Sequence, residues 1–286
     1  MTFTTLITTD DVLPHLDDLD WLIVDCRAAL ADPESGRNAY LEGHIPGAIY
    51  VDLEDELSGP IIRGTTGRHP LPEPGQAGRT FSRLGIGPGI QVVAYDDAGG
   101  ALAAGRLWWM LRWLGFDSAA VLDGGWQTWR RLGLPVRPGR EIHPPRSFQV
   151  HLRPELVVTA DQVERMRLDP AYQLVDARAS DRFRGQNEKI DPVAGHIPGA
   201  INAPYQENMT PEGTYRPKDE LRQRYLSLLG DVPADKVVYY CGSGVSAVHD
   251  ILAMMVAGLG EAHLFAGSWS EWITNHDRPV ARGLSQ

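Results

Sequence analysis

The sequence of 286 residues has little cysteine, no excess of positive charge and no long apolar run. Its two cysteines, Cys26 and Cys241, are too few for a disulfide framework in a chain of this length, so each thiol is judged by its surroundings. The formal net charge of -10 argues against nucleic acid or an anionic membrane surface as a partner. The most apolar stretch, residues 251–259, is far shorter than the ~20 residues of a membrane-spanning helix, so we expect a buried helix there.

The first residues, 1–7, lack the basic and apolar regions of a secretion signal, which predicts a cytoplasmic protein. The composition that is present, 43% hydrophobic and 22% charged residues, is typical of a folded protein rather than a disordered one. The length predicts about two domains of roughly 100 to 150 residues each. Each domain is therefore long enough to bury a core of its own.

The two halves of the sequence repeat each other. Residues 22–27 (LIVDCR) resemble residues 173–178 (QLVDAR), and both are apolar runs that end in Asp-x-Arg. Downstream, residues 43–49 and 195–201 share the same sequence, GHIPGAI. Identical segments that follow similar apolar runs in the same order indicate a duplicated domain.

The repeat continues where an apolar run ends in Asp96 in the first half and in Cys241 in the second. Asp96 therefore occupies the position of Cys241 in the first copy. We expect an N-terminal domain over residues 1–137, a Pro-rich linker over 138–155 and a C-terminal domain over 156–286.

Short β-branched runs alternate with helical patterns in both halves, and the runs are apolar at every position. Strands of this kind, separated by helices, predict an α/β fold with a parallel sheet covered on both faces. Ligands bind beyond the carboxyl ends of such strands, which draws attention to the loops after Tyr95 and Tyr240. The expected strands are 22–24, 92–95, 174–175 and 237–240, and two of the expected helices are 103–114 and 246–256.

Residues 241–246 (CGSGVS), which we name the cysteine loop, join an expected strand to an expected helix. Two glycines allow successive N–H groups to turn toward the Cys241 sulfur, and the positive end of the helix also favours an anion. Both features favour the thiolate, which is the nucleophile. The alternative is a small packing residue on a tight turn, and we expect that role for Cys26, which has no glycines beside it. The candidate loop residues besides Cys241 are Gly242, Ser243, Gly244, Val245 and Ser246.

Taken together, the repeated motifs and the replacement of Cys241 by Asp96 in the first copy resemble the tandem-domain rhodanese family of thiosulfate and 3-mercaptopyruvate sulfurtransferases. The resemblance covers nearly the whole chain. It implies two rhodanese-like domains, each a mostly parallel sheet with helices on both faces, of which only the second is catalytic. It also implies that Cys241 takes a sulfane sulfur from a small anionic donor as a persulfide and passes it to cyanide, a thiol or thioredoxin. The resemblance implies neither a metal nor an organic cofactor.

The resemblance also points to residues that bind the donor. The cysteine loop is similar to the Cys-Gly-Ser-Gly-Val-Thr loop of mercaptopyruvate enzymes, and it lacks the basic residues of the animal thiosulfate enzymes. The family's anion-binding arginine is matched by Arg182. Mercaptopyruvate enzymes have a second arginine before Gly-His-Ile-Pro, but the corresponding interval here, residues 186–194, offers only Lys189. The donor therefore stays open between 3-mercaptopyruvate and thiosulfate.

A further feature of the family is a serine in the cysteine loop that is backed by a histidine and a carboxylate. Ser243 matches the serine, and His69 and Glu54 are the expected partners in a proton relay. A relay of this kind suits 3-mercaptopyruvate, whose enolate leaving group needs a proton.

Two other functions are weighed against sulfur transfer. A cysteine phosphatase would need an arginine six positions after Cys241, where this chain has Ala247. A non-catalytic interaction module would explain the first half, because Asp96 cannot accept sulfur. The glycines around Cys241 argue against that function for the whole chain.

Overall fold

The computed structural model describes residues 2–29, 32 and 34–283, so the outermost residues of the two expected domains, 1 and 286, lie outside it. Contacts divide the chain into two compact units. The domain boundaries expected from the sequence remain a prediction. Unit 1 comprises the described parts of Met1–Gly59, Pro72–Arg153 and Pro211–Tyr215, and unit 2 those of Pro60–Leu71, Pro154–Thr210 and Arg216–Gln286.

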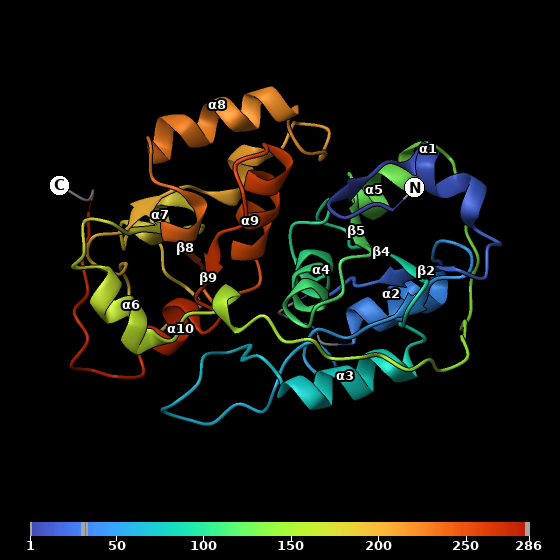
Figure 1. The fold of residues 1–286 in the computed structure, drawn as a ribbon, viewed down its shortest axis with the longest axis horizontal. Coiled ribbons are helices and arrows are strands. Elements are labelled where there is room, and N and C mark those ends of the chain that lie inside the picture. The colour runs from blue at the N-terminus through green and yellow to red at the C-terminus, as the bar shows by residue number, and fades with distance from the viewer. Residues whose placement is uncertain (1, 30–31, 33, 284–286) are drawn as a thin grey trace. The chain divides into compact units, whose positions relative to one another are not determined.

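Unit 1 contains a parallel sheet in the order β1-β5-β4-β2-β3. Helix α4 packs against β4 and β5 (Figure 1). The strands are β1 (Leu6–Ile7), β2 (Trp21–Asp25), β3 (Ile49–Tyr50), β4 (Gln91–Tyr95) and β5 (Ala119–Leu122). The helices are α1 (Thr9–Val12), α2 (Ser35–Glu42), α3 (Pro74–Arg83), α4 (Ala103–Trp113) and α5 (Gly125–Arg131), with a 3-10 turn at Leu13–His15.

Unit 2 contains a parallel sheet in the order β7-β6-β8-β9. Helix α8 lies beside α9 (Figure 1). The strands are β6 (Gln173–Asp176), β7 (Ile201–Asn202), β8 (Val237–Tyr240) and β9 (His263–Leu264). The helices are α6 (Ala160–Met166), α7 (Ser180–Phe183), α8 (Lys218–Leu229), α9 (Ala247–Val256) and α10 (Ser268–Trp272), with 3-10 turns at Pro154–Leu156, Tyr205–Asn208 and Ala234–Lys236.

The sheet of unit 2 repeats the arrangement of four strands of unit 1, since β7-β6-β8-β9 corresponds to β3-β2-β4-β5. Strand β8 is buried at every position because helices cover both of its faces. Side chains alternate between the two faces of a strand. Val238 and Tyr240 pack with Trp269 and Trp272 of α10, whereas the Tyr239 hydroxyl lies on the other face, 3.1 Å from the Met254 sulfur of α9. The predicted α/β fold with covered parallel sheets is confirmed.

The apolar stretch predicted as a buried helix forms most of α9. Residues 251–254 of this helix are buried, and the helix ends at Val256. Within the described residues, no helix has the length and apolar character needed to cross a membrane.

Candidate active site

Cys241 is the first residue after β8, at the carboxyl end of the sheet in unit 2. Its N–H donates to the Ser268 hydroxyl at 3.0 Å, and its carbonyl accepts from the N–H of Trp269 at 3.0 Å. The strand end is therefore fixed against the start of α10. The Cys241 side chain is buried, with 1% exposed.

The cysteine loop turns a backbone amide toward the buried sulfur. The N–H of Gly244 donates to Cys241 Sγ at 3.1 Å. Gly244 has a φ of +76°, and a Cβ at this position would lie 2.1 Å from the Ala266 carbonyl oxygen. Both the backbone conformation and the close approach require glycine, as the sequence pattern predicts. The amide thus places a hydrogen-bond donor against the sulfur, although the side chain is buried.

Ser268 is a residue of this site that the sequence analysis missed. It has a φ of +54°, a conformation that costs a non-glycine residue roughly 1 kcal/mol or more. Its hydroxyl accepts from the N–H of Cys241, donates to the Phe265 carbonyl at 2.9 Å and lies 4.0 Å from Cys241 Sγ. The corresponding residue of unit 1, Gly125, has a similar φ of +50°. The signal in the sequence was a serine at a repeat position where the other copy has glycine.

Ser243 and His69 are brought together as expected. Ser243 Oγ lies 2.7 Å from His69 Nδ1, and both side chains are buried. His69 groups with unit 2 because the segment Pro60–Leu71 belongs to that unit. Glu54 belongs to unit 1, where its N–H donates to Asp52 Oδ1 at 2.8 Å, and its part in a proton relay remains a prediction.

Two guanidinium groups lie beside Gly242, the residue that follows Cys241. A Cβ on Gly242 would be 2.8 Å from Arg68 Nη2 and 3.7 Å from both terminal nitrogens of Arg182. Arg182, on α7, was expected at the site. Arg68 was not, although it directly precedes His69. A larger residue at position 242 would displace these cations, which is a second reason for glycine in the loop.

Both arginines are held by buried carboxylates of the segment between α7 and β7. Arg182 donates from Nε and Nη2 to the two oxygens of Glu188, each at 3.0 Å, and from Nη2 to Asp191 Oδ2 at 3.1 Å. Arg68 Nη1 donates to Asp191 Oδ1. The Glu188 and Asp191 side chains are each 2% exposed, and the sequence analysis identified neither.

The environments of the two carboxylates differ. Burial raises the pKa of Asp191, against the attraction of Arg68 and Arg182. Burial also acts to raise the pKa of Glu188, but hydrogen bonds from Arg182 and from backbone amides outweigh it and lower that pKa. Glu188 is therefore the more firmly ionised partner of Arg182.

The remaining expected residues differ in exposure. Lys189 is exposed, so its role in donor binding remains a prediction. Val245 is buried, and Ser246 directly precedes α9 without capping it through its side chain.

The corresponding loop of unit 1, residues 96–104, begins with Asp96, and we name it the aspartate loop. The Asp96 side chain fills the inside of this loop. The carboxylate is 1% exposed and accepts four backbone hydrogen bonds. Burial raises the pKa of Asp96, and these amides oppose that effect. The loop thus surrounds a carboxyl group that its own sequence supplies. The donors are the N–H groups of Ala98 at 2.9 Å, Gly100 at 2.7 Å, Leu102 at 3.0 Å and Ala104 at 3.2 Å.

Cys26 follows β2 in unit 1 and has the features of a packing residue. Its side chain is 0% exposed, and burial raises the pKa of its thiol well above the usual range, with Asp25 and Asp96 adding to the effect. A thiol in this environment stays protonated and is a poor nucleophile.

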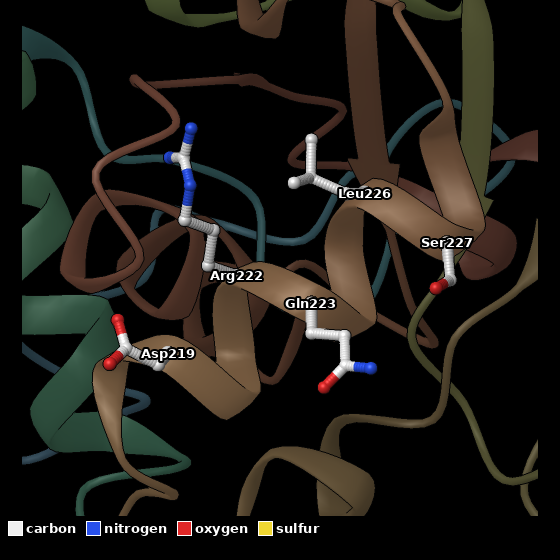
Figure 2. Close-up of a pocket in the computed structure, with 5 residues that line it drawn as sticks. All are labelled: Asp219, Arg222, Gln223, Leu226 and Ser227. Carbon is white, nitrogen blue, oxygen red and sulfur yellow. The ribbon is translucent and has the colours of Figure 1, made fainter.

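A pocket of about 450 Å³ lies on the surface of α8 (Figure 2). All five side chains that line it come from this one helix and are exposed, and no residue predicted for the active site is among them. The pocket therefore adds nothing to the chemistry of the cysteine loop. The lining residues are Asp219, Arg222, Gln223, Leu226 and Ser227.

Comparisons with known proteins agree with the repeat and with the fold. The model of the rhodanese-like domain matches residues 8–132 and again residues 159–275. A Pseudomonas aeruginosa protein named as a probable 3-mercaptopyruvate sulfurtransferase is 46% identical over 97% of this chain and 98% of its own length. A Mycobacterium tuberculosis protein that carries the name of a thiosulfate sulfurtransferase is 42% identical over 92% of this chain and 91% of its own. The solved structure of 3-mercaptopyruvate sulfurtransferase from Leishmania major has a TM-score of 0.84 and 31% identity, covering 96% of this chain and 75% of that one.

The chain belongs to the rhodanese family and contains two rhodanese-like domains. Its activity is that of a sulfurtransferase, which moves sulfur from a donor to an acceptor.

Proposed function

We propose that this sulfurtransferase takes a sulfane sulfur from 3-mercaptopyruvate or thiosulfate onto Cys241 and passes it to a thiophilic acceptor. The observation that carries the proposal is the Cys241 sulfur, which accepts a hydrogen bond from Gly244 at the end of β8 while two arginines lie beside Gly242. A thiolate is the nucleophile, and arginines bind the anionic part of the donor.

In the first step, the Cys241 thiolate attacks the sulfane sulfur and forms a sulfur–sulfur bond. The bond between that sulfur and the rest of the donor breaks, and its electron pair leaves with the enolate of pyruvate or with sulfite. In the second step, the acceptor attacks the outer sulfur, and the electron pair of the sulfur–sulfur bond returns to Cys241 as a thiolate. Covalent catalysis divides one transfer into two easier ones.

The aspartate loop supports a persulfide intermediate. Each carboxylate oxygen of Asp96 is two bonds beyond Cβ, as the outer sulfur of a persulfide on Cys241 would be. Four amides bind these oxygens in unit 1. The cysteine loop follows the corresponding strand of a sheet with the same order, so we infer that its amides bind a persulfide anion in a similar way.

The direct test is to incubate the protein with each donor and to measure the mass of the peptide that contains Cys241. We expect a gain of one sulfur atom, which cyanide or a thiol then removes. An unmodified peptide together with hydrolysis of an aryl phosphate would favour a phosphatase. An unmodified peptide without hydrolysis would favour an interaction module.

The Ser243–His69 pair predicts a difference between the two donors. In His69→Gln, we expect kcat with 3-mercaptopyruvate to fall by roughly two orders of magnitude, because the enolate loses its proton donor. With thiosulfate, kcat should change little, since sulfite needs no proton to leave. Steady-state kinetics with both donors checks this, and an equal loss with both would contradict a proton-transfer role.

The donor and the acceptor remain alternatives within this proposal. The relatives described above are named for 3-mercaptopyruvate and for thiosulfate, and each name applies to its own protein. Cyanide, a small thiol and thioredoxin are the proposed acceptors. We propose the cytoplasm as the compartment, supported by two cysteines that are both free thiols.

A further inference from the structure

We propose that Arg68 is the second arginine that binds the anionic group of the donor, beside Arg182, and that Asp191 is the positioning residue that holds the two guanidinium groups together. This inference rests on the proposed function and deepens it, because it defines the donor site of the same Cys241.

The first argument is the position of the two cations. Arg68 Nη2 and Arg182 Nη1 lie 2.8 and 3.7 Å from the place where Gly242 would carry a Cβ. Gly242 directly follows Cys241 in the sequence, so both cations lie beside the neighbour of the residue that accepts the sulfur. A small donor has its anionic group only one to three bonds from the sulfur that it gives up. Its sulfur can therefore meet Cys241 while its anionic group meets both arginines.

The second argument is that each guanidinium binds a carboxylate with some of its nitrogens and places another beside Gly242. Arg182 uses Nε and Nη2 for Glu188, and Arg68 uses Nη1 for Asp191. Arg68 Nη2 and Arg182 Nη1, which make none of these bonds, lie beside Gly242 together with Arg182 Nη2. A guanidinium has five N–H donors in a rigid fork, so some of them can fix its orientation while others bind the anionic group of a donor.

The third argument is that Asp191 bridges the two cations. Its Oδ1 accepts from Arg68 and its Oδ2 from Arg182, and its side chain is 2% exposed. Two guanidinium groups that bind one small anion would repel each other if no carboxylate lay between them. Asp191 offsets that repulsion and fixes their spacing.

The backbone explains how Arg68 reaches the loop. The Arg68 N–H donates to Ser270 Oγ at 3.1 Å, and the Ser270 N–H donates to the Gly242 carbonyl at 2.9 Å. A Cβ on Gly67 would lie 2.5 Å from the Gly267 carbonyl oxygen, so glycine is required for this approach. Because of this packing, two consecutive residues contact two consecutive residues of the loop. Arg68 lies beside Gly242, and His69 lies beside Ser243.

The test compares Arg68→Gln with Arg184→Gln in the full chain. Arg184 lies just beyond α7 and donates from Nε to Gln186 rather than to the site, so it is a matched control for the loss of one positive charge. For Arg68→Gln, we expect the Michaelis constants for both donors, and the inhibition constant of pyruvate, to rise about 10- to 100-fold. Pyruvate carries the carboxylate but no sulfur, so it reports anion binding alone.

Several results would overturn the inference. An unchanged inhibition constant for pyruvate, with only kcat reduced, would mean that Arg68 acts through His69 and not on the donor. If Asp191 positions the two arginines, the inhibition constant of pyruvate should rise in Asp191→Asn. A fall in that constant would mean that Asp191 competes with the donor instead. If Arg68→Gln does not fold, Arg68→Lys replaces it and should also weaken pyruvate binding, because lysine lacks the rigid fork of N–H donors.

The wild-type protein separates this inference from the proposed function. If Cys241 gains no sulfur from either donor in the wild type, the proposed function fails. If Cys241 gains sulfur and Arg68→Gln binds pyruvate and both donors as Arg184→Gln does, only the role of Arg68 fails.

Discussion

Cys241→Ser is expected to lower kcat/KM for sulfur transfer by at least about three orders of magnitude, while Cys26→Ser leaves it nearly unchanged. A serine hydroxyl at position 241 keeps the size of the side chain but cannot form a persulfide. Cys26 is fully buried, and its raised pKa keeps the thiol protonated. Initial rates with both donors, and peptide masses after incubation with each donor, measure the two effects.

Thermal unfolding of both variants serves as the control for this comparison. Because each substitution changes one buried atom, a loss of activity without a matching loss of stability assigns the effect to chemistry. A fully active Cys241→Ser protein, or an inactive but folded Cys26→Ser protein, would refute the assignment of the nucleophile.

Asp96→Ala is expected to lower the free energy of unfolding by about 3 to 5 kcal/mol. The substitution removes the buried acceptor of four backbone N–H groups, and these donors then lack a partner inside unit 1. Urea unfolding followed by tryptophan fluorescence measures the change, since the buried Trp108 and Trp109 lie in α4, the helix that begins at the end of this loop.

Asp17→Ala is the matched control for this prediction because it makes the same substitution at an exposed position of unit 1. We expect it to change the free energy of unfolding by less than about 0.5 kcal/mol. If Asp96→Ala is as stable as Asp17→Ala, the aspartate loop does not depend on its internal anion. The use of Asp96 as an analogue of a persulfide would then lose its support.

The parts of the structure that the sequence predicted are those with a local or a repeated signal. Runs such as 92–95 and 237–240 are apolar at every position, and they form β4 and β8, strands buried on both faces. The loop after Tyr240 contains two glycines, and it directs the Gly244 amide at the sulfur. These features depend on residues close to one another in the sequence, so periodicity and spacing reveal them.

The parts that were missed depend on contacts between distant residues. Arg68 pairs with Asp191, 123 positions away, and no periodic pattern links the two. Glu188 was equally hidden because a carboxylate in an irregular segment is usually exposed to solvent. His69 could be matched to Ser243, 174 positions away, only through the family resemblance.

The grouping of Pro60–Leu71 with unit 2 bears on how such a protein can change during evolution. A gene that kept only the second copy would still encode the cysteine and its glycines. It would lose the imidazole and the guanidinium of His69 and Arg68, which are encoded within the first copy. On the proposed mechanism, the first copy would therefore be needed for those two side chains, even though Asp96 cannot accept sulfur.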